Sequence, residues 1–132
     1  RARCRSPPGA LCVSSSAASD VYKGQGLAPY GEPRFADVIR DKLLDLKDDG
    51  SFRLNMSYFA FLERDVMTNA RFASLFGGPA RAPESPLTIR EMDLARSVQA
   101  VTEEIVLRMA RHAKARTGAR YLCMAGGVAL NC

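Results

Sequence analysis

One stretch of the sequence carries matched signals for the start and the end of a long helix. Thr88-Ile-Arg-Glu91 is a capping box, in which the Thr88 side chain accepts a backbone N–H three residues on and Glu91 reaches back. Gly118 is a natural C-terminal stop, because glycine readily adopts the left-handed conformation that closes a helix. The sequence therefore predicts a helix from Thr88 to about Thr117, and this is the strongest constraint on the fold.

The predicted helix has an apolar stripe and a polar side. Apolar residues at helical spacing form the stripe that we expect to be buried: Met92, Ala95, Val98, Val101, Ile105, Met109 and Ala113. We expect Asp93, Ser97 and Gln99 on a polar, solvated face. The alternative is that one of these three side chains reaches a ligand cleft.

The residues before this helix predict several short elements. Apolar residues recur at helical spacing and predict a helix over about 34–46. Asp48-Asp49-Gly50 predicts a turn, and the alternation that follows predicts a strand over 52–56. Three further elements are expected: a helix over about 57–64, a short helix capped by Thr68 and ended by Gly77-Gly78, and a proline-rich connector over 79–86.

The segment that bears on chemistry lies after the long helix. Tyr121-Leu-Cys-Met-Ala125 predicts a short apolar strand, and Gly126-Gly127 turns it toward a helix that begins near Val128. Glycines let a backbone approach a ligand without an intervening Cβ, and unpaired N–H groups at a helix start attract an anion. Asn131, about one turn on, could bond a ribose or a base. This unit indicates a phosphate or adenosine site, and a plain tight turn is the alternative.

The first 25 residues differ in character from the rest. They mix Arg, Pro, Cys, Ser and Ala without helical or strand periodicity, and Pro-Pro-Gly interrupts any apolar core of a signal peptide. The run from Val13 to Lys23 resembles translated sequencing-adapter DNA. We therefore divide the chain into residues 1–25, a disordered tail that is either a non-native artefact or a natural tail, and residues 26–132, a fragment of one domain.

Composition argues against several classes of protein. Hydrophobic residues make up 47% and charged residues 25% of the 132-residue chain, as in soluble globular proteins, and we expect no membrane segment. Much of the net charge of +5 lies in the first 25 residues. Along the rest, basic and acidic residues are interspersed, whereas a nucleic-acid partner would require a clustered basic face.

The cysteines and the single histidine do not predict a metal site. Cys4, Cys12, Cys123 and Cys132 lack C-x-x-C spacing, so no zinc site can be assembled with one histidine. This cysteine usage favours a reducing, cytoplasmic compartment. We expect the histidine, His112, to be an exposed residue near a helix end rather than a general base, and we assign no catalytic residue.

Several motifs resemble the O-carbamoyltransferases of nodulation and antibiotic biosynthesis. They occur in the family's order: Gly26-Leu-Ala-Pro-Tyr-Gly-Glu-Pro33, Asp41-Lys-Leu-Leu-Asp-Leu-Lys-Asp-Asp-Gly50, Phe52-Arg-Leu-Asn-Met56, Met67-Thr-Asn69 and Leu75-Phe-Gly-Gly78. The long helix, the strand after it and Ala125-Gly-Gly-Val-Ala-Leu-Asn131 resemble the second half of an actin-like ATPase domain. The implied fold class is α/β, a partial actin-like ATPase domain that is helix-rich and has an incomplete sheet.

The resemblance implies a reaction and its cofactors. Such enzymes join an actin-like domain to a YrdC-like domain, form a carbamoyl-adenylate from ATP and carbamoyl phosphate, and transfer the carbamoyl group to a hydroxyl of a small molecule. Gly126, Gly127 and Asn131 match the nucleotide-contacting turn. Tyr30 and Gly31 belong to a family loop that we expect near the nucleotide cleft. The Tyr30 ring either stacks on a base or packs the loop onto the core.

The resemblance also implies parts that these residues do not supply. The family's divalent-metal site uses histidines upstream and an aspartate downstream, so we expect no metal ligands here and no full reaction from this chain alone. Two alternatives remain, a tRNA threonylcarbamoyl transferase-like protein and a non-catalytic fragment or scaffold. The loop from Gly26 to Gly31 favours the small-molecule enzymes. Neither the acceptor nor the oligomeric state follows from the sequence.

Overall fold

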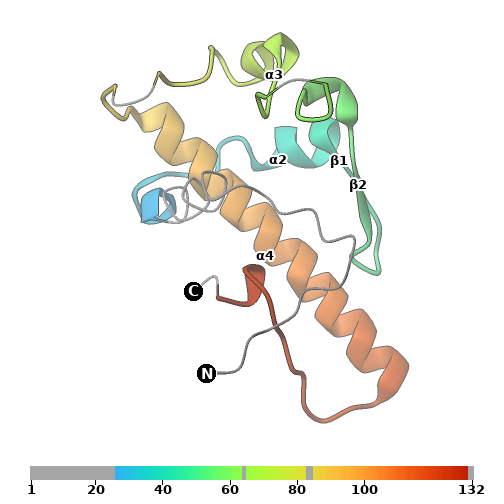
Figure 1. The fold of residues 1–132 in the computed structure, drawn as a ribbon. Coiled ribbons are helices and arrows are strands. Elements are labelled where there is room, and N and C mark those ends of the chain that lie inside the picture. The colour runs from blue at the N-terminus through green and yellow to red at the C-terminus, as the bar shows by residue number, and fades with distance from the viewer. Residues whose placement is uncertain (1–25, 64, 83–84, 131–132) are drawn as a thin grey trace, which may run out of the picture.

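A computed structural model describes residues 26–63, 65–82 and 85–130, and for Leu130 it describes the backbone alone. Figure 1 shows one long helix, α4 (Ile89–Thr117), crossing the molecule. In this view residues 36–75 lie on one side of its axis, and the segment that follows it folds back on the other side, where residues 28–30 also lie (Figure 1).

Both ends of α4 are where the capping signals place them. The Glu91 carboxylate accepts hydrogen bonds from the Thr88 N–H, at 2.9 Å, and from the Thr88 hydroxyl. Gly118 has a left-handed φ of 65° and donates its N–H to Lys114 O at 2.9 Å. The predicted long helix is therefore confirmed, because local cap chemistry is sufficient to fix its boundaries.

The segment before the first strand is only partly as predicted. Its elements are a 3₁₀ turn at Ala28–Tyr30 (η1), a short α-helix at Ala36–Val38 (α2), a π-helical turn at Ile39–Leu43 (η2) and a strand at Leu44–Leu46 (β1). The expected helix over 34–46 is wrong at its C-terminal end. Leu44-Asp45-Leu46 alternates apolar and polar residues, so it can pair as a strand as well as continue a helix.

A hairpin follows at the predicted turn. Strand β1 pairs antiparallel with β2 (Phe52–Leu54), with Leu44 opposite Leu54 and Leu46 opposite Phe52. Gly50 in the turn has a φ of 86°, which glycine adopts without strain. The turn and the core of the predicted strand over 52–56 are confirmed. These two strands form the sheet of the described chain, which is a small, helix-rich α/β arrangement.

The next segment corrects two predictions. Instead of a helix over 57–64 there is a 3₁₀ turn at Met56–Tyr58 (η3), followed by an isolated antiparallel bridge between Phe59 and Thr68. The short helix exists as α3 (Ala70–Leu75), but its cap is Asn69, whose Oδ1 accepts the N–H groups of the first turn. Thr68 pairs with Phe59 in the bridge, and the residue after it, Asn69, occupies the N-cap position.

The core lies between α4 and the elements before it. Its buried side chains are Ala36, Ile39, Leu43, Phe76, Val101 and Ile105. Phe76 packs edge-on against Phe35 with ring centroids 5.5 Å apart. Only Val101 and Ile105 of the predicted stripe are buried, whereas Val98 and Met109 are 51% and 42% exposed. The buried face of α4 is therefore rotated away from the predicted apolar stripe, toward the side of the helix that carries polar residues.

The segment after α4 does not form the predicted strand. Residues 121–125 pair with neither β1 nor β2, and Tyr121, Leu122 and Met124 are exposed. A strand requires a partner for its N–H and C=O groups, and the described part of the chain supplies none here. A 3₁₀ turn at Val128–Leu130 (η4) stands where a helix start is expected.

Candidate functional site

The loop that contains Tyr30 and Gly31 is held against the first half of α4. Ala28 is buried, at 5% exposure, and anchors the start of the loop. Gly31 lies so close to the helix that a Cβ on it would be 2.1 Å from Met92 O and 2.6 Å from Asp93 N. Its φ of −116° is open to any residue, so the close approach is what requires glycine here.

Two polar side chains of α4 bind the loop backbone. Asp93 is 3% exposed, and its Oδ1 accepts the Glu32 N–H at 2.8 Å. Ser97 is fully buried; its Oγ accepts the Phe35 N–H at 3.0 Å and donates to Asp93 O at 2.6 Å. Burying such groups is costly unless they are hydrogen-bonded, and here they are.

This burial corrects the prediction for Asp93 and Ser97. We expected both on a solvated face, but they are among the most buried side chains of the described residues. The signal that could have revealed them is their spacing. Asp93 and Ser97 precede Val101 and Ile105 at intervals of four residues, so all four share one side of the helix. The third residue expected on the solvated face is Gln99. Its side chain donates a hydrogen bond to Glu103 at 3.0 Å.

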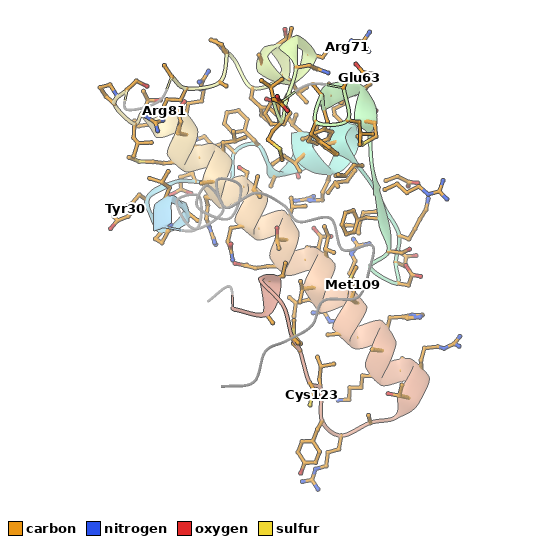
Figure 2. All side chains as sticks on the ribbon, in the orientation of Figure 1. Tyr30, Glu63, Arg71, Arg81, Met109 and Cys123 are labelled. Atoms are coloured by element: carbon orange, nitrogen blue, oxygen red, sulfur yellow. The ribbon has the colours of Figure 1, made fainter. Side chains whose placement is uncertain are left out.

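Tyr30 projects from the loop into solvent. Its side chain is 75% exposed, and Figure 2 shows the ring directed away from α4. Of the two alternatives for Tyr30, packing of its ring on the core does not occur, since Ala28 and the Asp93 and Ser97 bonds hold the loop instead. The structure leaves the ring free to contact a ligand.

The glycine turn after α4 is open. Gly126 has a φ of 105°, and a Cβ added at either Gly126 or Gly127 would meet no atom within 4 Å. The Ala129 N–H bonds Gly126 O at 3.1 Å, which closes the turn. Asn131, the third residue predicted to contact a nucleotide, lies outside the described residues. The role of this turn stays a prediction.

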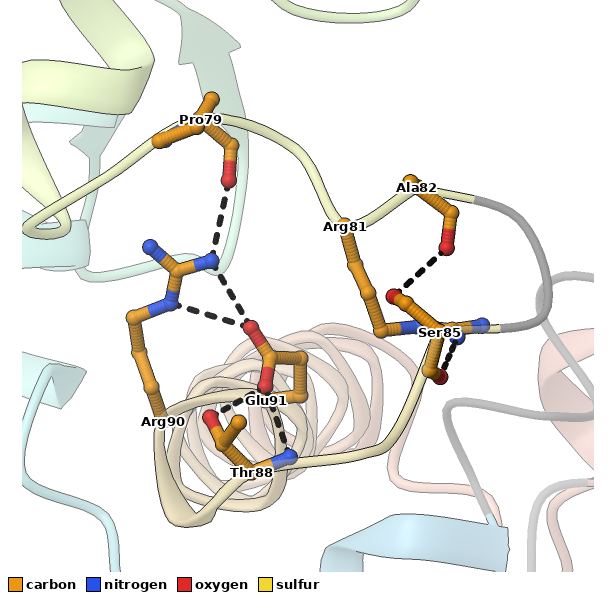
Figure 3. Close-up of polar contacts among 7 residues, drawn as sticks. All are labelled: Pro79, Arg81, Ala82, Ser85, Thr88, Arg90 and Glu91. Carbon is orange, nitrogen blue, oxygen red and sulfur yellow. Dashed lines mark hydrogen bonds and ion pairs between the residues drawn. The ribbon is translucent and has the colours of Figure 1, made fainter.

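A cavity of about 780 Å³ lies between the Phe59–Thr68 bridge, α3 and the start of α4. Phenylalanine rings line it together with an ion pair, in which Arg90 bonds Glu91 Oε1 at 2.8 Å and Pro79 O at 2.9 Å (Figure 3). The hydrogen bond from the Thr88 side chain, together with Arg90, lowers the pKa of Glu91 to about 2. This carboxylate is therefore ionised at neutral pH and serves the helix cap.

A second cavity, of about 430 Å³, lies between the end of α4 and residues 119–123. Neither cavity is lined by Tyr30, Gly126 or Gly127. Within the described ranges, no three His, Cys, Asp or Glu side chains are grouped to hold a metal ion. In the same residues, no helix is both long enough and apolar enough to cross a membrane.

The chain matches one protein family over most of its length. The model of the carbamoyltransferase N-terminus matches residues 11–132. The chain belongs to this carbamoyltransferase family. The match begins within residues 1–25, which we expected to lie outside the domain, so the boundary at residue 26 stays a prediction.

This carbamoyltransferase N-terminal segment is similar to longer proteins, two of which are nodulation proteins. It is 60% identical over 114 residues to the uncharacterized protein sll1178 of Synechocystis, and covers 18% of that protein. It is 35% identical over 113 residues to the nodulation protein NolNO of Sinorhizobium fredii, covering 15% of it. It is 33% identical over 114 residues to the nodulation protein NolO of Bradyrhizobium diazoefficiens, covering 19% of it.

Each of these matches takes in 86% of the chain. The chain therefore spans less than a fifth of the length of these curated relatives. The sequence left several functional alternatives open. Of these, membership of the carbamoyltransferase family agrees with the family match and with the nodulation relatives.

Proposed function

We propose that this chain is part of an ATP-dependent O-carbamoyltransferase. The observation that carries the proposal is the family match over residues 11–132. Because the relatives are several times longer, the proposed activity belongs to a longer polypeptide that also holds a YrdC-like domain and a divalent-metal site. The actin-like ATPase fold is part of the same proposal.

The proposed chemistry activates carbamoyl phosphate at the expense of ATP. Carbamoyl phosphate is first hydrolysed to carbamate and inorganic phosphate. A carbamate oxygen then attacks the α-phosphorus of ATP, which gives carbamoyl-adenylate and displaces pyrophosphate. A hydroxyl of a small molecule then attacks the carbamoyl carbon, and AMP leaves. The mixed anhydride makes this attack feasible because AMP is a good leaving group.

Within this reaction we assign nucleotide binding to two parts of the chain. The exposed ring of Tyr30 stacks on the adenine base, and its loop, including Gly31, lines the cleft. The backbone of Gly126 and Gly127 approaches the phosphates, since no atom occupies the space that their side chains would take. Asn131 bonds the ribose or the base.

The test is to incubate the complete protein with ATP, Mg²⁺ and carbamoyl phosphate and to measure pyrophosphate and total adenylate, the latter as carbamoyl-adenylate together with the AMP that it releases on hydrolysis. We expect both products to appear at equal rates and only when carbamoyl phosphate is present. The matched control omits carbamoyl phosphate and supplies acetyl phosphate instead. Formation of ADP in place of AMP, or the absence of any ATP turnover, would refute the adenylate route.

A further inference from the structure

We propose that Asp93 and Ser97 of α4 are positioning residues that hold the loop of residues 28–35 so that Tyr30 meets the nucleotide. This inference rests on the proposed function, because ATP is the ligand that it assigns to Tyr30. Neither Asp93 nor Ser97 touches the nucleotide. Both act through the loop.

The first support is that the hydrogen bonds of these side chains to the loop are not required for packing of the apolar core. An isolated buried carboxylate is unfavourable, and an apolar residue at position 93 would extend the Val101 and Ile105 stripe directly. Instead, Asp93 and Ser97 bind backbone N–H groups that lie 61 and 62 residues earlier in the chain. Hydrogen bonds of this kind fix the loop at one position along the helix, whereas apolar contacts would allow the loop to shift along it.

The second support is that the loop is held at several points while its aromatic ring is not. Ala28 is buried at the start, Gly31 abuts the backbone of Met92, and the bonds to Glu32 N and Phe35 N hold the end. Tyr30 lies between these points and is 75% exposed. A rigidly placed aromatic ring with no role in the core is pre-organised for a ligand.

Arg34 gives the proposal a variant that leaves the buried bonds in place. Its Nε lies 3.3 Å from Asp93 Oδ2, and its side chain is 67% exposed. Arg34→Gln therefore removes the ion pair at the solvent edge, while Asp93 still accepts from Glu32. Ser97→Ala removes the acceptor of the Phe35 N–H. Asp93→Asn replaces the charged acceptor of the Glu32 N–H with a neutral one and sets an NH₂ donor against Arg34.

The test is a double-mutant cycle on ATP binding to the complete protein. We expect Asp93→Asn and Ser97→Ala each to raise the Kd for ATP about tenfold, equivalent to about 1.4 kcal/mol. In a Tyr30→Ala background the same substitutions should change that Kd by less than about twofold, because the ring through which they act is gone. The KM for carbamoyl phosphate should remain unchanged in every variant.

Two substitutions on the same helix are matched controls. Thr102→Val removes a hydroxyl that, like that of Ser97, bonds the carbonyl four residues earlier, but reaches no loop. Glu103→Gln neutralises an exposed carboxylate, to match Asp93→Asn. Both should leave the Kd for ATP at the wild-type value. Equal effects of Asp93→Asn with and without Tyr30, or a lower kcat with unchanged ATP affinity, would overturn the positioning role.

Amide hydrogen exchange of residues 28–35 separates failure of this inference from failure of the proposed function. Arg34→Gln keeps the buried bonds and should leave exchange of this loop near the wild-type rate. We expect Asp93→Asn and Ser97→Ala to accelerate exchange of this loop about tenfold while the exchange of η2 stays unchanged. If ATP does not bind the wild-type protein at all, the proposed function fails. If ATP binds but the loop exchanges at wild-type rate in both Asp93→Asn and Ser97→Ala, the positioning role fails alone.

Discussion

Gly31 and Asp93 illustrate what a single residue contributes to this structure. Gly31 brings the loop backbone within contact of α4, and the carboxylate of Asp93 accepts the next N–H along the chain. The sequence indicates that the Gly31 loop matters, because its motif resembles a family loop. It does not reveal Asp93, because a carboxylate on a helix is usually solvated and only the partner loop, 61 residues away, makes its burial favourable.

Gly31→Ala is expected to destabilise the chain by roughly 1–3 kcal/mol, because the new Cβ would overlap the backbone of α4 and the loop would have to move. Denaturant unfolding monitored by circular dichroism measures the change. Gly26→Ala is the matched control, since a Cβ there meets no atom within 4 Å. Equal stability of the two variants would contradict the close approach.

Tyr30→Ala is expected to separate binding from stability. The exposed ring contributes little to folding, so unfolding should change by less than about 0.5 kcal/mol. Loss of stacking should weaken ATP binding by roughly 1–3 kcal/mol, while Tyr30→Phe keeps most of the affinity. Calorimetric titration with ATP distinguishes these cases, and unaltered affinity of Tyr30→Ala would remove Tyr30 from the site.

The elements differ in how far local sequence determines them. The bounds of α4 follow from cap residues that lie within or next to the helix, and the hairpin turn follows from Asp49 and Gly50. Strand β1 depends on β2, and residues 121–125 lack a partner among the described residues, so the same kind of apolar run has different outcomes. Strand formation could not be predicted from either run alone, because ladder bonds are made between segments.

The stability that the cap of α4 contributes is expected to depend on pH. The folded-state pKa of Glu91 is about 2, below its ordinary value of 4.5, so its contribution to stability is present above pH 4.5 and is lost as the pH falls toward 2. Glu91→Gln should therefore be less stable than wild type at pH 7 by about 1 kcal/mol, and this difference should shrink below pH 4.5.

Denaturant midpoints measured between pH 2 and pH 7 test this prediction. Glu103→Gln provides the control, because Glu103 is exposed and lies outside the cap. A stability difference between wild type and Glu91→Gln that stays constant down to pH 2 would show that the carboxylate charge does not support the cap.

At the scale of the whole molecule, the chain is short in comparison with the curated relatives that it matches. The described residues form a small α/β arrangement with two strands, and the curated relatives are several times longer than the chain. Apolar side chains after α4, including Tyr121, Leu122 and Val128, are exposed. The sequence motifs predict the family, but they could not predict the exposed position of Tyr30, because its loop is held by α4 residues that lie 61 and 62 positions from their partners in the chain.

We propose that this carbamoyltransferase segment holds ATP at Gly126 and Gly127. Calorimetric titration of the complete protein with ATP and Mg²⁺, comparing wild type with Gly127→Val, tests it most directly. A Cβ at Gly127 meets no protein atom within 4 Å, so the substitution should leave folding intact and obstruct only a ligand. We predict saturable ATP binding to the wild type and at least about a tenfold loss in Gly127→Val, or roughly 1.4 kcal/mol. Equal affinity of the two proteins would contradict the claim.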